Sequence, residues 1–210
     1  MLRATHFGPT VLVCLLSFVM ADLLQSFGRA LEVTFAIFWG QCFVGWSNDL
    51  IDYPRDLAAQ RFEKPLVRGD IKVATLKVLV PMALAVALVT SWFGPLGFAG
   101  TSVHALALAS ASAYNLGMKG SRLSALPYVV SFGLLPIAIY DSVGRTPPAW
   151  LIVAVALFAT AFHFVNVIKD MEGDRALKIY GLPQRLGSKA SLCVAVALCL
   201  LASAVVVFAR

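Results

Sequence analysis

Long apolar segments recur along the whole chain and alternate with polar connections. Seven of them are long enough to cross a hydrocarbon core of ~30 Å as helices: residues 8–27, 30–48, 73–93, 95–116, 122–141, 148–168 and 188–209. The alternating ten-residue segments of a membrane β-barrel are absent from the sequence. Because only helices or closed barrels satisfy the backbone in lipid, the pattern predicts an all-α polytopic transmembrane helical bundle. We expect residues 1–210 to form a single membrane domain.

The composition agrees with this prediction. The chain is 60% hydrophobic and 13% charged, whereas a soluble domain carries about 25% charged residues. All four cysteines lie in apolar segments and lack the spacing of metal ligands. We therefore expect them to pack between helices and not to form disulfides.

The net charge of +6 has an explanation in membrane topology. If the N-terminus is cytoplasmic, 14 of the 17 basic residues lie on the inner side, in Arg3 and the connections 49–77, 117–122 and 169–189. Only Arg29, Arg145 and Arg210 then face outward. This bias is typical of a multi-pass protein of the cytoplasmic membrane. We therefore expect a lipid bilayer, and no nucleic acid, as the environment of the chain.

Two short clusters contain more than half of the eleven acidic residues. The first, residues 48–56, reads NDLIDYPRD, and the second, residues 166–174, reads NVIKDMEGD. On a helix, Asp49, Asp52 and Asp56 share one face, because they are spaced i, i+3 and i+7. The same holds for Asn166, Asp170 and Asp174, spaced i, i+4 and i+8. Both clusters fall on the predicted cytoplasmic side.

Pro54 is typical of a helix start or a turn, so the first cluster is expected at the end of a span. Carboxylates stacked on one helix face repel, at roughly 3 kcal/mol per pair for ~6 Å and an effective dielectric of 20. The sequence-based explanation is a countercharge that the chain itself does not supply, namely a divalent cation such as Mg²⁺. The alternative for each cluster is a solvated polar loop. The predicted metal ligands are Asp49, Asp52, Asp56, Asp170 and Asp174.

Several other polar side chains lie beside these clusters or between them. Arg61, Lys64 and Arg68 either contact lipid head groups or surround an anionic ligand. Lys119 either joins this set of cations or is an anchor at the cytoplasmic membrane face. Lys169 either forms a simple pair with Asp170 or places a cation beside the carboxylates of the second cluster. Glu172 points about 200° away from Asp170 on an ideal helix, so we expect it either to face solvent or to support the metal ligands without binding the metal itself. His163 lies on the face of Asn166, deeper in the membrane, and is either a helix-packing donor or part of a cavity wall.

The two halves of the chain resemble each other loosely. In each, an apolar span ends in an acid cluster, and a basic loop with Pro and Gly follows: KPLVRG at residues 64–69 and LPQRLG at residues 182–187. Internal repeats in membrane proteins often place a site at the interface between them.

On these motifs the chain resembles the UbiA superfamily of intramembrane prenyltransferases. That family carries Asn-Asp-x-x-Asp-x-x-x-Asp after its second helix, matched by Asn48, Asp49, Asp52 and Asp56. It also carries Asp-x-x-x-Asp after its sixth helix, often within Lys-Asp-x-Glu-Gly-Asp-Arg, matched by residues 169–175. The Lys-Pro-Leu-x-x-Gly stretch and the pair Tyr114 and Lys119 look similar as well. The resemblance covers nearly the whole chain, in order.

The resemblance implies a polyprenyl diphosphate donor, Mg²⁺, and a small hydrophobic or aromatic acceptor of the quinone-pathway type, in an active site that faces the cytoplasm. It implies catalytic roles for Asp49, Asp52, Lys119, Asp170 and Asp174. It implies contacts to the diphosphate from Asn48, Arg61, Lys64, Tyr114 and Lys169. Members of the family generally have nine spans, so a chain of seven spans is expected to be a short member or one that lacks the last two helices.

Two alternatives remain open on the sequence alone. A non-catalytic member of the family would bind prenyl lipids with the same motifs. A cation-coupled membrane transporter would also contain acidic residues, but these are expected near the middle of spans.

Overall fold

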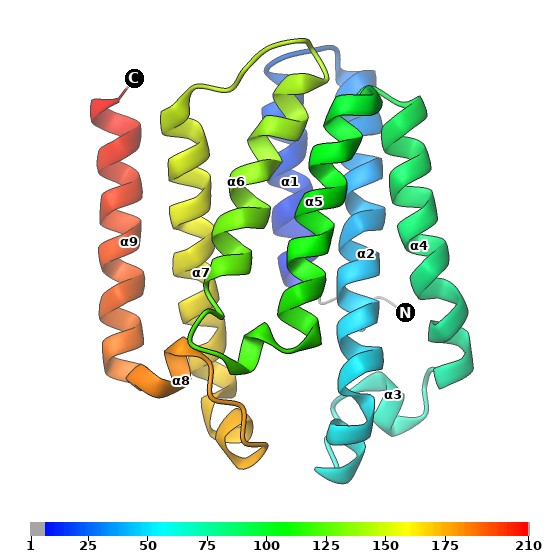
Figure 1. Ribbon diagram of the computed structural model, residues 1–210, viewed down its shortest axis with the longest axis vertical. Helices are drawn as coiled ribbons and strands as arrows, with labels where there is room; N and C mark the ends of the chain where they lie inside the picture. The colour runs from blue at the N-terminus through cyan, green and yellow to red at the C-terminus, as the bar shows by residue number, and fades with distance from the viewer. Residues whose placement is uncertain (1–6, 210) are drawn as a thin grey trace. The chain divides into compact units, whose positions relative to one another are not determined.

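The computed structural model describes residues 7–209, so Arg3 and Arg210, used above for the topology, lie outside the described residues. These residues form helices and no strand (Figure 1). The long helices are α1 (Phe7–Asp22), α2 (Phe27–Ala58), α4 (Val73–Phe93), α5 (Gly97–Leu116), α6 (Leu126–Asp141), α7 (Ala149–Ala176) and α9 (Ser188–Phe208). Each coincides with one predicted span. The shorter elements are α3 (Pro65–Arg68), the 3₁₀ turn η2 (Met118–Gly120) and α8 (Leu182–Leu186). The all-α prediction is therefore confirmed.

Three helices in the described part of the chain are long and apolar enough to cross a membrane, by length and composition: Val73–Phe93, Ala149–Arg175 and Ser188–Phe208. Helices α1 and α6 are apolar but span 16 residues each. Helices α2 and α5 carry more polar side chains. On the outer surface of α9, Leu192, Val196 and Leu200 are 50–67% exposed. Apolar side chains exposed in this way are what contact with lipid requires.

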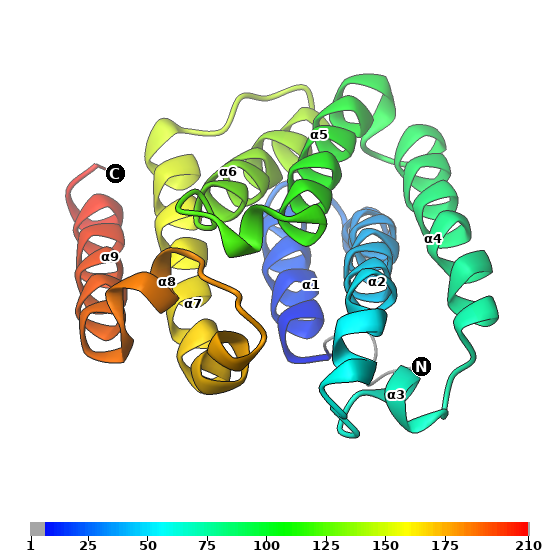
Figure 2. The ribbon, with the colours of Figure 1, turned by 60° about the horizontal axis from the view of Figure 1, so that its bottom comes forward.

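Two compact units make up the chain, and each contains one acid cluster. The first unit comprises Met1–Leu108 and Ala138–Arg145, and the second comprises Ala109–Ile137 and Thr146–Arg210. In the first unit, α2 packs against both α1 and α4 (Figure 1). In the second, α7 packs along α9, and the short α8 contacts both (Figure 2).

Helix α2 continues through Pro54 and ends at Ala58, so the prediction that Pro54 begins a helix or a turn is wrong. A proline inside a helix removes one backbone hydrogen bond and crowds the preceding turn. Here the proline is exposed and lies four residues before the helix end, beyond the apolar part of α2, where the loss is small. The first acid cluster is therefore helical throughout.

Helices α2 and α7 end in the same way. After α2, Gln60 adopts a left-handed conformation (φ 54°), and the Arg61 N–H donates to the carbonyl of Asp56 at 3.0 Å. After α7, Lys178 is left-handed (φ 58°), and the Ile179 N–H donates to the carbonyl of Asp174 at 2.8 Å. Both are Schellman motifs, in which the chain reverses and returns along the helix end. The last aspartate of each cluster thus lies at the turn, and the likeness of the two halves extends to backbone geometry.

The first unit contains a close approach between helices. His104 of α5 shares a hydrogen bond with Ser91 of α4 (Nδ1 to Oγ 2.9 Å), and both side chains are buried. A Cβ atom placed on Gly40 of α2 would lie 2.8 Å from His104 Nε2. Glycine at this position therefore lets α2 and α5 approach closely, as small residues do between membrane helices.

We predict that Gly40→Ala destabilises the protein, because its Cβ atom would force His104 away from Ser91. Overpacking of this kind costs about 1–3 kcal/mol, and the thermal unfolding midpoint in detergent should fall by several degrees. Gly28→Ala, in the same helix, is the control, because nothing lies within 4 Å of its added Cβ atom. Equal midpoints for the two variants would contradict the packing described here.

Candidate functional site

The first acid cluster lies on the last turns of α2 and is buried. Asp49, Asp52 and Asp56 are 3%, 8% and 2% exposed. Asn48, which precedes them, is half-buried. The helical spacing inferred from the sequence therefore holds, and it places three carboxylates on one side of α2 within two turns. The alternative of a solvated loop is wrong for this cluster, because these residues are helical and their carboxylates are covered.

Each of these carboxylates is paired with a basic side chain: Asp49 with Lys64 (2.8 Å), Asp52 with Arg55 (2.8 Å) and Asp56 with Arg61 (3.4 Å). The sequence-based argument that the countercharge must come from outside the chain is thus wrong. Lys64 is 15 residues away from Asp49 in sequence, so only the folded loop reveals the pair. Sequence reasoning also missed the pairing of Arg55, one turn beyond Asp52.

The loop that carries Lys64 is held in place by apolar packing. Pro65 begins α3, for which its fixed φ is suitable, and Gly69 ends this short helix with φ 86°. Leu66 of α3 belongs to one buried cluster with Trp46 of α2 and Leu76 of α4. Burying a leucine side chain contributes about 1.5–3 kcal/mol. The cluster thus fixes α3 against the end of α2 (Figure 2). Lys64, directly before α3, is thereby held beside Asp49.

Electrostatics and donor chemistry in this cluster fit a metal ion. Burial raises the pKa of Asp56 above its ordinary value, and this effect outweighs the nearby charges of Lys64 and Arg61, which lower it. The side chains of the cluster offer only oxygen ligands, from three carboxylates and the amide of Asn48, as Mg²⁺ prefers. In the described part of the chain, no three His, Cys, Asp or Glu side chains converge on one point. A metal here would therefore use one or two carboxylates and complete its coordination with other oxygens, which is common for Mg²⁺.

The second acid cluster, at the end of α7, is more open. Lys169, Asp170 and Glu172 are exposed, and Asp174 is half-buried. The exposure of Glu172 agrees with its expected orientation. Met171 is 3% exposed, and its Sδ lies 3.3 Å from Ser188 Oγ at the start of α9. This face of α7 therefore packs on α9 and leaves the charged residues beside it accessible.

A short helix returns to this cluster too. Gln184 of α8 donates from Nε2 to Asp174 Oδ2 at 2.8 Å, and Arg175 Nη2 donates to the backbone carbonyl of Gln184 at 3.2 Å. Sequence reasoning did not single out Gln184. The available signal was the likeness of the loops 64–69 and 182–187: α3 and α8 each have a proline in their first two positions. Each loop also brings one polar side chain to an aspartate.

Tyr114 and His163 meet in an aromatic cluster of the second unit. The ring of Tyr128 stacks on His163 at 4.4 Å between centroids, and Tyr114 lies edge-on to both. His163 is 1% exposed, and its Nε2 lies 3.4 Å from Ser124 Oγ. The same oxygen accepts from the Leu182 N–H at 3.0 Å. His163 therefore packs between helices, which is the first of its two expected roles.

Lys119 lies in η2 and is half-buried. Its carbonyl oxygen would be 2.4 Å from a Cβ atom on Gly181, so the segments before α6 and before α8 touch at this point. Each unit thus assembles part of the predicted set. The first unit joins Asp49, Asp52 and Asp56 to Arg61 and Lys64, and the second unit joins the segment of Lys119 to the segment that holds Asp174.

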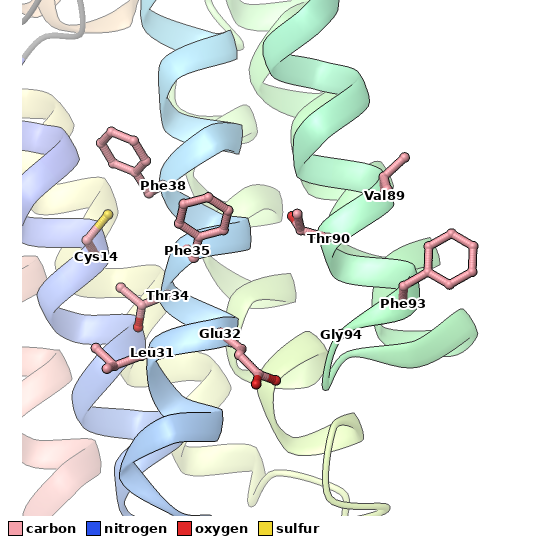
Figure 3. A pocket seen from close by; sticks show the side chains of 10 residues that line it. All are labelled: Cys14, Leu31, Glu32, Thr34, Phe35, Phe38, Val89, Thr90, Phe93 and Gly94. Atoms are coloured by element: carbon pink, nitrogen blue, oxygen red, sulfur yellow. The ribbon is translucent and has the colours of Figure 1, made fainter.

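A hollow of about 820 Å³ lies in the first unit, between α2 and α4 (Figure 3). Its lining is mostly apolar and includes Phe35, Phe38 and Phe93, with Glu32 as an acidic member. Glu32 precedes Asp49 by 17 residues of one helix, about 26 Å along its axis. The hollow is therefore separate from the acid cluster.

Comparison with known proteins identifies the family. The family model described as the UbiA prenyltransferase family matches residues 9–210. A search of curated proteins finds no match. Among solved structures, a UbiA homologue from Archaeoglobus fulgidus bound to Cd²⁺ is similar with a TM-score of 0.78 and 18% identity, over 97% of this chain and 75% of that one. The homologue bound to GPP and Mg²⁺ gives a TM-score of 0.73 and 19% identity, with the same coverage.

A structure from a study of digeranylgeranylglyceryl phosphate synthase has a TM-score of 0.70 and 21% identity, over 97% of this chain and 74% of that one. At these identities the likeness shows the fold. The family match covers nearly the whole chain, and both acid motifs lie within the matched residues. This chain belongs to the UbiA prenyltransferase family.

Proposed function

We propose that this protein is an integral-membrane, Mg²⁺-dependent prenyltransferase. It moves a polyprenyl group from its diphosphate to a small hydrophobic or aromatic acceptor. The observation that carries the proposal is the pair of acid clusters at the ends of α2 and α7. In each cluster one aspartate is held by a side chain from the loop that follows: Asp49 by Lys64, directly before α3, and Asp174 by Gln184 of α8. The homologue from Archaeoglobus fulgidus was solved with GPP and Mg²⁺ and with DMAPP and Mg²⁺, which supports the choice of donor.

In this proposal Asp49, Asp52, Asp56, Asp170 and Asp174 hold Mg²⁺, with Asn48 beside them. The metal supplies positive charge that neutralises the diphosphate and favours its departure. Lys64 and Arg61 pair with Asp49 and Asp56 in the structure. If these carboxylates bound the metal, both basic side chains would be available to donate to diphosphate oxygens. Lys119, Lys169 and Tyr114 are proposed as further contacts to the diphosphate.

The proposed reaction breaks the bond between the allylic carbon and the diphosphate oxygen, and the bonding electrons leave with the diphosphate. The basic side chains stabilise the charge that develops on the leaving group. The acceptor then forms a bond to the allylic carbon and releases a proton. The apolar helices keep water from competing with the acceptor. An aromatic ring such as that of half-buried Tyr114 stabilises the allylic cation through its face.

The positions of the acids favour this function over cation transport. Both clusters lie on the last turns of α2 and α7, next to basic loops, and not in the middle of the helices. Formation of a prenylated product separates the enzyme from a non-catalytic member that binds prenyl lipids.

We predict that Asp49→Asn and Asp170→Asn each lower the rate of prenyl transfer roughly a hundredfold, about 3 kcal/mol of transition-state stabilisation. Glu172→Gln, in the same segment as Asp170, should cost much less, because Glu172 points away from the helix face that Asp170 shares with Asp174. Products are measured by mass spectrometry after incubation of purified protein with a panel of prenyl diphosphates and lipid extract. Thermal unfolding of each variant serves as the control for folding. A similar loss in all three variants would count against the assigned roles.

The proposed orientation predicts that residues 59 and 146 lie on opposite faces of the membrane. Ala59 follows α2 and Thr146 lies between α6 and α7, and both are exposed. In a variant that lacks the four native cysteines, Ala59→Cys should react with an impermeant thiol reagent only from the cytoplasmic side. Thr146→Cys should react only from the other side. Labelling of both from the same side would refute the assignment of the spans.

A further inference from the structure

Gln184 is a polar side chain in an unusually buried position. It is 5% exposed, and its Oε1 is buried without a hydrogen-bond partner among the described residues. A buried polar atom without a partner costs about 1–3 kcal/mol. An apolar side chain of the same size would avoid this cost, so burial alone does not explain an amide at this position. The side chain does have one polar contact: its Nε2 donates to Asp174 Oδ2 at 2.8 Å.

The surroundings leave the Gln184 side chain little freedom. Ser191 Oγ donates to the carbonyl of Pro183 at 3.0 Å, and Arg175 Nη2 donates to the carbonyl of Gln184 itself. A Cβ atom on Gly181 would lie 2.7 Å from Gln184 Oε1, so the absence of a side chain there makes room for the amide. The amide group is therefore fixed against Asp174 from several directions.

The other unit offers a comparison. Lys64, directly before α3, neutralises Asp49, whereas Gln184, within α8, holds Asp174 with a neutral donor. A neutral amide fixes the direction of a carboxylate but does not cancel its charge. The contact from α8 thus orients the half-buried carboxylate of Asp174 through a hydrogen bond from a neutral donor.

We propose that Gln184 is a positioning residue, which orients Asp174 for binding of the Mg²⁺–diphosphate group. This inference rests on the function proposed above. It predicts that loss of the amide weakens the response to Mg²⁺ while the fold survives, because α8 keeps its backbone contacts.

Gln184→Met tests the proposal, because methionine has a similar size and cannot donate. The Mg²⁺ concentration that gives half-maximal prenyl transfer should rise at least fivefold, and the rate at saturating Mg²⁺ should change less than twofold. A second readout needs no turnover: the rise in unfolding temperature caused by Mg²⁺ and geranyl diphosphate together should shrink at a fixed Mg²⁺ concentration. Ser191→Ala is the matched control, since it loosens α8 without removing the donor to Asp174. Its half-saturating Mg²⁺ concentration should stay within twofold of the wild type.

Combination with Asp174→Asn separates positioning from general stability. If Gln184 acts through Asp174, Gln184→Met should cause no further loss of Mg²⁺ response in the Asp174→Asn background. An unchanged Mg²⁺ response in Gln184→Met, an equal change in Ser191→Ala, or an additive effect in the double variant would overturn the inference. If the wild-type protein shows neither Mg²⁺-dependent transfer nor a shift with Mg²⁺ and geranyl diphosphate, the proposed function itself fails.

Discussion

Three buried carboxylates and the three basic side chains that pair with them set the structure of the first acid cluster. An ionised carboxylate shielded from water is costly unless it is paired, and removing one partner of a buried pair costs about 3–5 kcal/mol. Asp49 is 3% exposed, so the connection after α2 must bring Lys64 within reach. The Schellman turn at Gln60 reverses the chain, and the burial of Leu66 fixes α3. The segment that follows α2 is therefore fixed both by the ion pair of Lys64 with Asp49 and by the burial of Leu66.

The two units hold the aspartates of their acid clusters with different kinds of side chain. In both, the helix with the acid cluster ends in the same turn, and a short helix with a proline in its first two positions follows. The first cluster is covered and its charges are balanced by lysine and arginine, whereas the second is open and holds Asp174 through an amide. The carboxylates of the first cluster therefore already have cationic partners in place, while Asp174 of the second is oriented by the neutral amide of Gln184.

Much of the fold was predictable from the sequence. In an apolar segment long enough to cross a membrane, the backbone can satisfy its hydrogen bonds within the segment itself only as a helix. All seven predicted spans coincide with long helices in residues 7–209. Helix ends were less predictable: the effect of Pro54 depends on its distance from the end of α2, which tertiary contacts set. The acids were found from their periodicity and family motif. Lys64 was also singled out, but its pairing with Asp49 was not, and Gln184 was not singled out at all, since a pair formed across a folded loop leaves no periodic signal. The sequence signal for these contacts was the likeness of the two loops with Pro and Gly, residues 64–69 and 182–187.

Binding of a prenyl diphosphate to the wild-type protein with and without Mg²⁺ tests the central claim most directly. The claim is that the buried aspartates, which pair with lysine and arginine side chains in the structure, would bind the diphosphate only through Mg²⁺. Isothermal titration of geranyl diphosphate should therefore give measurable heat of binding in Mg²⁺ and none above background in EDTA. Undiminished binding in EDTA would contradict the claim, because the basic side chains alone would then suffice for the diphosphate.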